Sequence, residues 1–326
     1  MSSAAQLPPP LTKLLADSVL RGVSDLHFEA MQDEYRVRQR YLGHVQPLLG
    51  VSKLQGEQWL AALKNAAGTD VTQRRKAQDG RFLIHYQQLR IDCRLNVLPT
   101  LWGEKIVLRL FNQTGAALTL AELGLLPEQL QLMQQSLQDQ QGLILVTGPT
   151  GSGKTRTLYA MIEALKTRHI NISTVEDPVE IPIQGVNQTA VNQHSKLTFA
   201  ATLRALLRQD PDVIMVGEIR DPETAEMTLQ AAQTGHLVLA TLHASHAIAA
   251  IIRLQQLGVS HAQLAAALNL LINQRLINLG HKRTGVFELL HVGERERTIM
   301  LASPNSNNYW QQLHAMVQGK RTEGVC

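Results

Sequence analysis

The sequence predicts an α/β chain in which a doubly wound, mainly parallel sheet follows a smaller α+β domain. Its 326 residues exceed the roughly 100–200 of a typical domain, so two domains are expected. Beyond residue 119, short apolar runs alternate with helical stretches, the pattern of parallel strands with helices on both faces. Before that point, strand-like runs follow one another with fewer helices between them.

Composition is that of an ordinary globular protein, with 44% hydrophobic and 18% charged residues. A net charge of +4 is too small to indicate nucleic-acid binding. No apolar run approaches the ~20 residues needed to span a bilayer, and the first ten residues do not resemble a signal peptide. Cys93 and Cys326 lie in unrelated segments, so free thiols in a reducing compartment are expected.

The first domain is predicted over residues 1–111, with a linker at 112–118. A helix is predicted over 11–23, ending near Gly22. Strands are predicted at residues 35–40, 82–86, 89–97 and 105–111. The linker is assigned from its polar and glycine content.

The second domain is predicted over residues 119–326. Thr119 is a candidate helix cap, and an amphipathic helix is expected over 127–138. Its strands are predicted at the apolar runs 143–147, 170–175, 213–216 and 237–241. Because helical segments separate these runs, parallel pairing is expected.

The most specific signal is a glycine-rich octapeptide between an apolar run and a helix, Gly148, Pro149, Thr150, Gly151, Ser152, Gly153, Lys154 and Thr155. It fits the phosphate-loop pattern G-x-x-x-x-G-K-[ST] in the context that supports the motif. Backbone N–H groups and the helix N-terminus of such a loop bind phosphate oxygens. Lys154 is predicted to reach the β- and γ-phosphates of ATP, and the Thr155 hydroxyl to hold Mg²⁺.

Acidic residues follow two other apolar runs. Glu176 ends one run, and Glu218 follows another in a Walker B arrangement. Because ligands collect at the carboxyl ends of parallel strands, both acids are expected at the phosphate site. One should help hold Mg²⁺ and the other should orient the attacking water. Asp177 and Asp221 each precede a proline, so turn capping is as good an interpretation for them as catalysis.

Two histidines, His236 and His243, flank the apolar run 237–241. A histidine beside a strand is commonly a hydrogen-bonded neighbour without a catalytic role. Two histidines around one strand of a nucleotide-binding sheet are alternatively sensors of the γ-phosphate. The spacing fits both interpretations equally.

These segments together resemble the motor ATPases of type II secretion and type IV pili. The phosphate loop, an aspartate box at 176–180, a Walker B box at 217–221 and a histidine box at 236–243 occur in the order of that family. The N-terminal half is similar as well, at residues 24–29, 78–81, 94–100 and 103–109. The resemblance implies a RecA-like P-loop NTPase core preceded by a PAS-like domain.

The resemblance also implies a function: a cytoplasmic, Mg²⁺-dependent ATPase that works as a homo-hexamer at the base of an inner-membrane machine. It would be peripheral to that membrane and would drive pilus assembly or protein secretion through a platform membrane protein. A pilus-retraction motor or a DNA-uptake motor of the same family is the alternative.

The resemblance further assigns roles to site residues. Glu176 becomes the water-activating carboxylate, and Glu218 the one linked to Mg²⁺. His243 would read the γ-phosphate with His236 in support.

Arginines of the first domain become candidates for phosphate contacts across a subunit boundary: Arg81, Arg94 and Arg109. Ion pairs within their own domain are the competing interpretation for each of them.

One departure from the family concerns zinc. Secretion and pilus-extension members usually carry a four-cysteine zinc loop after a Gln-Arg-Leu motif. Here no cysteine follows Gln274, Arg275 and Leu276 before residue 290. Zinc needs about four nitrogen or sulfur ligands, so no structural zinc is expected.

A DNA helicase or translocase is the rival class, because it shares the phosphate loop. Aromatic residues are only 4% of the chain, and no basic stripe is interleaved with them. No specific nucleic-acid partner is therefore expected. Stimulation of ATPase activity by single-stranded DNA would favour the rival class.

Overall fold

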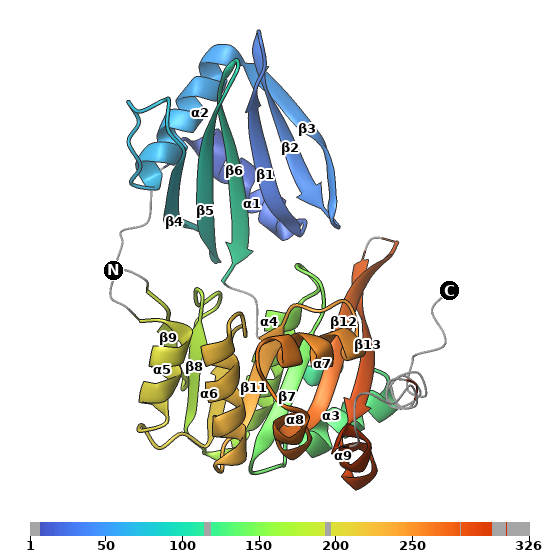
Figure 1. The fold of residues 1–326 in the computed structure, drawn as a ribbon. Helices are drawn as coiled ribbons and strands as arrows, with labels where there is room; N and C mark the ends of the chain where they lie inside the picture. Colours follow the sequence, from blue (N-terminus) through green and yellow to red (C-terminus); the bar gives the residue numbers. More distant parts are fainter. Residues whose placement is uncertain (1–6, 114–118, 193–196, 281, 302–310, 312–326) are drawn as a thin grey trace. The chain divides into compact units, whose positions relative to one another are not determined.

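The computed structural model describes residues 7–113, 119–192, 197–280, 282–301 and 311 (Figure 1). The chain divides into two compact units, Met1–Ala116 and Ala117–Cys326, here called the first and second unit. Each has a sheet and a hydrophobic core of its own.

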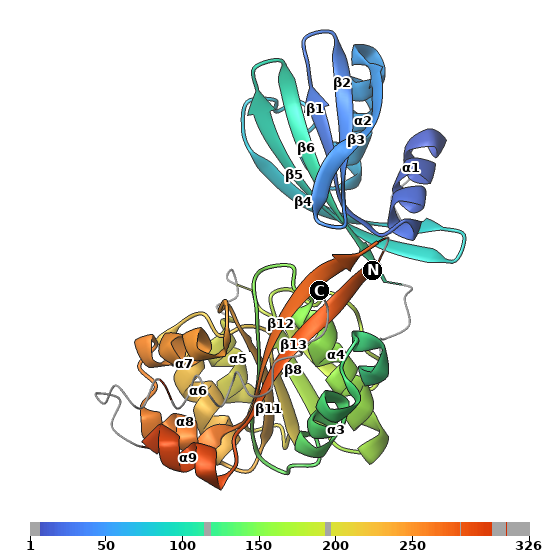
Figure 2. The ribbon, with the colours of Figure 1, turned by 90° about the vertical axis from the view of Figure 1, so that its right-hand side faces the viewer.

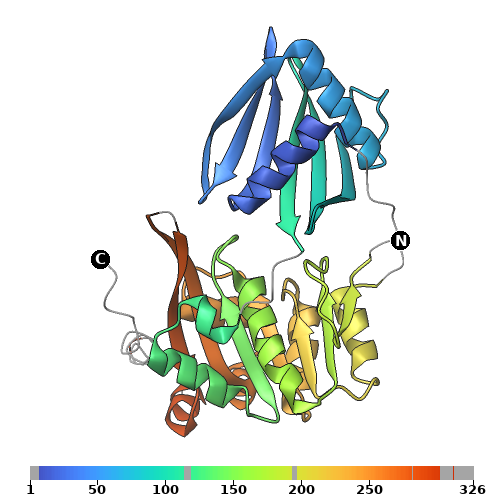
Figure 3. The ribbon, with the colours of Figure 1, turned by 180° about the vertical axis from the view of Figure 1, so that it is seen from behind.

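The first unit is built on a six-stranded antiparallel sheet in the order β3-β2-β1-β6-β5-β4. Both helices of the unit cover the same face of this sheet (Figure 3). The strands are β1 (Val23–Ala30), β2 (Glu34–Tyr41), β3 (His44–Ser52), β4 (Gln78–Tyr86), β5 (Leu89–Thr100) and β6 (Gly103–Asn112), and the helices are α1 (Pro9–Leu20) and α2 (Lys53–Ala66).

Apolar and polar residues alternate along the strands, and this alternation places both helices on one face of the sheet. In β1, Leu26 and Phe28 are fully buried in the core with Leu11 and Leu15 of α1. His27 between them, with Asp25 and Glu29 on either side, is polar and belongs to the other face, because successive side chains of a strand point to opposite sides. One face of the sheet is therefore apolar and helix-covered, and the other is rich in charge.

The structure corrects the predicted helix 11–23. The helix ends at Leu20, and residue 23 already begins β1. Gly22 has φ +81°, a left-handed conformation that ends the helix at little cost because glycine has no Cβ. Strands β1 and β3 and helix α2 were not among the predicted elements, whereas β2, β4, β5 and β6 overlap predicted strands. The last strand, β6, extends to Asn112, inside the predicted linker.

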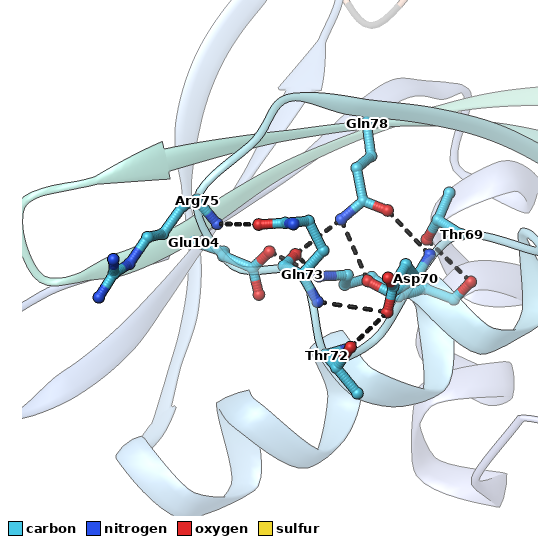
Figure 4. Close-up of polar contacts among 8 residues, drawn as sticks. Thr69, Asp70, Thr72, Gln73, Arg75, Gln78 and Glu104 are labelled. Carbon is cyan, nitrogen blue, oxygen red and sulfur yellow. Dashed lines mark hydrogen bonds and ion pairs between the residues drawn. The ribbon is translucent and has the colours of Figure 1, made fainter.

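A buried ion pair ties α2 to the sheet of the first unit. Lys64 is fully buried, and its ammonium donates to Glu104 Oε1 at 2.6 Å and to the carbonyl of Gln73 at 2.9 Å. Gln73 belongs to a polar loop in which Gln78 Nε2 donates to the same carbonyl at 2.8 Å (Figure 4). Asp70 Oδ1 accepts the backbone N–H of Gln73 at 3.3 Å. Lys64 therefore joins helix, loop and strand.

The second unit contains a seven-stranded sheet in the order β13-β12-β7-β11-β10-β8-β9. All neighbouring strands are parallel except the β12–β13 pair, so the predicted mainly parallel sheet is confirmed. The strands are β7 (Gly142–Thr147), β8 (Ile172–Glu176), β9 (Asn187–Ala190), β10 (Val213–Val216), β11 (Leu237–Leu242), β12 (Leu268–Leu279) and β13 (Lys282–His291).

Helices cover both faces of this sheet, and Figure 2 shows the two layers on either side of the strands. The helices α3 (Pro127–Ser136) and α4 (Lys154–Leu165) lie on one face. On the other lie α5 (Phe199–Leu206), α6 (Pro222–Gln233), α7 (Ala247–Gln256) and α8 (His261–Ala267), followed by α9 (Glu294–Leu301).

The central strand β7 serves both layers. Ile144 and Val146 are buried in the core with α3 and α4, whereas Leu143 and Leu145 are buried in the core with α5 to α8. A strand buried on both faces is apolar throughout, which explains the continuous apolar runs of the sequence. The doubly wound architecture predicted from those runs is confirmed. In the part of the chain that the structure describes, no helix is both long enough and apolar enough to cross a membrane.

Removing the buried cation of the first unit should destabilise it. Lys64→Met keeps most of the side-chain volume but leaves Glu104 buried without its ion-pair partner, so we expect a loss of about 3 kcal/mol in the apparent unfolding free energy. Urea titration monitored by tryptophan fluorescence measures this, since Trp59 lies in the core of the unit. As a control, Arg21→Met in the same unit removes an exposed side chain that donates to the carbonyl of Asp17, and it should cost less than about 1 kcal/mol. Equal effects of the two substitutions would contradict the prediction.

Candidate nucleotide site

The phosphate loop joins the carboxyl end of β7 to the N-terminus of α4. Gly148, Gly151 and Gly153 all have positive φ, at 147°, 77° and 91°. At Gly148 an added Cβ would lie 2.3 Å from the carbonyl oxygen of Gln274, so no larger residue fits there. The helix that follows begins at Lys154, and its first N–H groups are oriented toward the loop, an arrangement suited to an anion.

Lys154 is buried within the loop that it follows. Its ammonium donates to the carbonyls of Gly148 at 2.9 Å and Pro149 at 3.1 Å, and lies 3.4 Å from Nδ1 of His243. Burial lowers the pKa of Lys154 below its usual value, and the Glu218 carboxylate opposes that shift. A desolvated cation held in the loop interacts strongly with phosphate oxygens.

His243 connects this lysine to the second acidic segment. Burial, and then the charge of Lys154, lower the pKa of His243 below 6.5, with Glu218 acting in the opposite direction. The ring is therefore neutral at pH 7, so that Nδ1 accepts from Lys154 and Nε2 donates to Glu218 Oε1 at 3.2 Å. Lys154, His243 and Glu218 form one chain across the ends of α4, β11 and β10.

Arg220 is a further charged group at this site, and the sequence did not single it out. Its Nε donates to Glu218 Oε2 at 2.7 Å and its Nη1 to Asp177 Oδ2 at 2.9 Å. The arginine thus links the ends of β8 and β10. Its position two residues after Glu218, in the Walker B segment, was the available signal.

Glu176 is 3% exposed and fully engaged by side chains. Its Oε2 accepts the Tyr159 hydroxyl, and its Oε1 accepts Thr174 Oγ1 at 2.6 Å and Gln188 Nε2 at 3.1 Å. Burial, followed by the charge of Glu176, raises the pKa of Tyr159, so that the hydroxyl remains a donor. These contacts favour a positioning role for Glu176.

Glu180 lies four residues further along the same acidic segment and is only partly buried. Its backbone N–H donates to the Tyr159 hydroxyl at 3.2 Å, so one tyrosine anchors both ends of the segment. Water has better access to Glu180 than to Glu176. The assignment of water activation to Glu176 therefore competes with an assignment to Glu180.

The two histidines have different environments. His236 precedes β11 and His243 follows it, so they lie at opposite edges of the parallel sheet, roughly 20 Å apart at about 3.3 Å per residue. His236 Nδ1 lies 3.1 Å from the carbonyl of Ala231 at the end of α6. The expected support of γ-phosphate sensing by His236 is therefore wrong, because the strand separates it from the loop. Asp221 caps α6 by accepting the N–H of Thr224 at 2.8 Å, which confirms the capping interpretation for that aspartate.

Side chains suited to Mg²⁺ are available beside the loop. Mg²⁺ prefers oxygen ligands and usually keeps waters and substrate phosphates in its shell, so one or two protein oxygens suffice. Thr155 offers a hydroxyl in the first turn of α4. Glu218 offers a carboxylate whose Oε1 lies 3.2 Å from His243 Nε2, and His243 in turn lies beside Lys154. These donors fit a magnesium–nucleotide complex. Within the described ranges, no three His, Cys, Asp or Glu residues are grouped to hold a metal by themselves.

The candidate arginines of the first unit form a row across its charged sheet face. Arg81 is opposite Arg94, Arg94 is opposite Arg109, and Arg109 is opposite Asp25. Arg109 Nε donates to Asp25 at 3.0 Å, and Arg81 makes two bonds to Asp92, at 2.7 and 2.9 Å. Both acids are buried, so the arginines neutralise charges of their own unit. Arg109 nevertheless keeps 61% of its side chain exposed.

The loop, the doubly wound sheet and the acids at the strand ends define the second unit as a P-loop nucleotide-binding domain. Residues 2–312 of the chain match the type II/IV secretion system protein family. The chain belongs to that family.

Relatives with assigned roles include transport and pilus proteins. The chain is 48% identical over 284 residues to the protein transport protein HofB homolog of Escherichia coli, covering 86% of this chain and 62% of that protein. It is 50% identical over 268 residues to the type IV pilus assembly ATPase PilB of Acinetobacter baylyi, covering 82% and 46%. It is 40% identical over 267 residues to the type II secretion system protein E of Klebsiella pneumoniae, covering 82% and 54%. The chain thus spans about half to three-fifths of these relatives' lengths.

Solved structures with the same fold include a pilus retraction motor and an ATPase. The pilus retraction motor PilT with bound ADP is 30% identical, with a TM-score of 0.73, and the match covers 97% of this chain and 91% of PilT. The Legionella pneumophila ATPase DotB has a TM-score of 0.81 at 22% identity, covering 98% and 91%, which supports the fold alone.

Substitution of the two acids should separate their roles. We expect Glu180→Gln to block ATP hydrolysis by more than about 100-fold while ATP still binds, because the amide cannot accept a proton from water. Glu176→Gln should instead lower the thermal unfolding midpoint. Tyr159, Thr174 and Gln188 all donate to the carboxylate, so the amide nitrogen would have to face at least one of these donors. Hydrolysis rates, ATP binding and thermal unfolding of both variants measure this. If Glu176→Gln keeps the wild-type midpoint and traps bound ATP, water activation belongs to Glu176.

Proposed function

We propose that this chain is the Mg²⁺-dependent ATPase subunit of a motor for type IV pilus assembly or type II secretion. The observation that carries the proposal is the link from the phosphate loop to two further strand ends through Lys154, His243 and Glu218. Such a link couples the group that binds phosphate to the acid that supports the metal. Relatives at 40–50% identity named as a pilus assembly ATPase and a secretion protein add to this support.

The residues of the site divide the work of phosphoryl transfer. Lys154 and the loop amides bind the phosphates and stabilise the charge that develops on them. Thr155 and Glu218 would hold Mg²⁺, which would supply positive charge to neutralise the phosphates. Neutral His243 can donate from Nε2 to an acceptor, so a change at the γ-phosphate would alter its contact with Glu218. Arg220 orients Glu218 and Asp177 by donating a hydrogen bond to each carboxylate.

The proposed setting is a homo-hexamer at the cytoplasmic face of the inner membrane, attached to it peripherally through a platform membrane protein. The family supports this setting, and the first unit, proposed to be PAS-like, would contribute to the ring. The expected lack of structural zinc remains a prediction, which elemental analysis of the purified protein can test.

A retraction motor is the second candidate, and a specific observation favours it: the 30% identity to PilT covers almost the whole chain. Higher identities to assembly and secretion proteins keep that candidate second. Twitching motility and pilus number in a deletion strain distinguish them, since loss of assembly removes pili and loss of retraction leaves excess pili.

Replacing the loop lysine tests the ATPase activity itself. Lys154→Ala should lower ATP hydrolysis by at least about 100-fold and weaken ATP binding, because the loop loses its cation. Phosphate release and fluorescent-nucleotide binding measure the two effects. The control Lys166→Ala, which removes a lysine paired with Glu163 at the other end of the same helix, should leave both unchanged. Hydrolysis by Lys154→Ala at the wild-type rate would refute the proposed site.

A mixing experiment tests whether arginines of the first unit act across subunits. A trans-acting arginine is worth about 10³–10⁵ in rate where measured. We therefore expect Arg94→Ala or Arg109→Ala subunits to inhibit wild-type partners beyond dilution while still binding ATP. The control is Arg21→Ala, at an exposed helix end of the same unit. Subunits with this substitution should leave the ATPase activity of the mixture unchanged. Activity that falls in proportion to the mutant fraction would show that the arginines do not act in trans.

A further inference from the structure

Strand β12 lies directly beside β7, and one of its side chains reaches the phosphate loop. Gln274 is 3% exposed, and its Nε2 donates to the carbonyl of Ser152 at 2.7 Å. Its Oε1 accepts the hydroxyl of Thr157, in the first turn of α4, at 2.6 Å. A residue more than 100 positions away in sequence therefore holds both the loop and the helix that follows it.

The backbone of Gln274 also lies against the loop. A Cβ added at Gly148 would come within 2.3 Å of the Gln274 carbonyl oxygen, and one added at Gly153 within 2.9 Å of its Nε2. The first and the last glycine of the loop thus pack on the same residue. Gln274 therefore forms one wall of the loop, with its backbone carbonyl against Gly148 and its side-chain amide against Gly153.

The bond to Ser152 has a consequence for phosphate binding. A trans peptide is planar, and its C=O and N–H point in opposite directions. When Gln274 holds the Ser152 carbonyl on the β12 side, the N–H of Gly153 is directed away from β12. Loops of this kind bind phosphate with such backbone N–H groups. The orientation of this peptide therefore decides whether one phosphate donor is available.

We propose that Gln274 is a positioning residue that keeps the Ser152–Gly153 peptide in its phosphate-binding orientation. The inference rests on nucleotide binding at the loop. An amide suits this task because it donates to one partner and accepts from the other, whereas a carboxylate only accepts and a thioether does neither effectively. The side chain acts on the nucleotide through the loop.

Gln274→Met tests the proposal, because methionine has nearly the same length and keeps the site filled. Losing the donor leaves the buried Ser152 carbonyl without its partner, so the Ser152–Gly153 peptide is no longer held. We therefore expect a roughly 10-fold increase in the dissociation constant for fluorescent ADP. The KM for ATP should rise by a similar factor, with a smaller fall in kcat.

Gln129→Met is the matched control. Gln129 is also a buried glutamine of the second unit with two bonds, donating to the Phe287 carbonyl at 2.9 Å and accepting the Leu126 N–H at 3.1 Å. Its loss should lower the thermal midpoint without changing ADP affinity. If both variants lose stability and neither loses affinity, Gln274 has only a structural role. If the wild-type protein itself binds no ADP, the proposed nucleotide site fails first.

Gln274→Glu adds a pH signature that a purely structural role would not produce. The carboxylate can still accept from Thr157 but cannot donate to Ser152, so ADP should bind weakly at pH 8. Protonation at lower pH restores a donor, so the deficit relative to the wild-type protein should shrink as pH falls toward 5.5. A deficit that stays constant over this range would contradict the proposed bond.

Discussion

Parallel pairing in the second unit is the constraint on which the rest of the site depends. Strands β12, β7, β11, β10 and β8 run in the same direction, so their carboxyl ends meet at one edge of the sheet. The phosphate loop, His243, Glu218 and Glu176 each follow or end one of these strands. At the end of β10, Gly217 lies close to the end of β8, since an added Cβ would be 3.1 Å from the Val175 carbonyl. This close approach brings the two acidic segments together.

At that edge of the sheet, burial determines the protonation state and the partners of the charged side chains. Lys154 and Glu218 are partly removed from water, and each has partners that offset the cost of desolvation. His243 lies between a cation and a carboxylate and stays neutral because burial and Lys154 both lower its pKa. A neutral ring can donate on one side and accept on the other, which a protonated ring cannot do. The site therefore keeps a continuous hydrogen-bonded path between the loop and Glu218.

In the first unit, the charged side chains form ion pairs across one face of the sheet. Its acids Asp25, Glu29 and Asp92 are buried on the open sheet face, and each is paired with arginine or lysine side chains. The pairs with Arg81 and Arg109 are needed to neutralise buried carboxylates, whatever else these arginines do. Arg109 is still more than half exposed, so pairing with Asp25 does not exclude a second anionic partner.

The sequence alone determined the elements whose signals are local. The octapeptide from Gly148 to Thr155 specifies its own loop, because its glycines and the following helix are consecutive. Apolar runs buried on both faces identified β7, β8, β10 and β11 for the same reason. Strand β1 was missed although Leu26 and Phe28 alternate with polar residues, because buried acids weaken its apolar signal.

Tertiary structure decided everything that depends on distance across the sheet. Only the tertiary structure showed that Arg220 joins Glu218 to Asp177 and that Glu176 is enclosed by Tyr159. The bond of Gln274 to Ser152 spans 122 positions and has no local signature. Side chains that meet through strand pairing carry no mark of their partners in sequence, because register and order arise from the packing of the whole sheet.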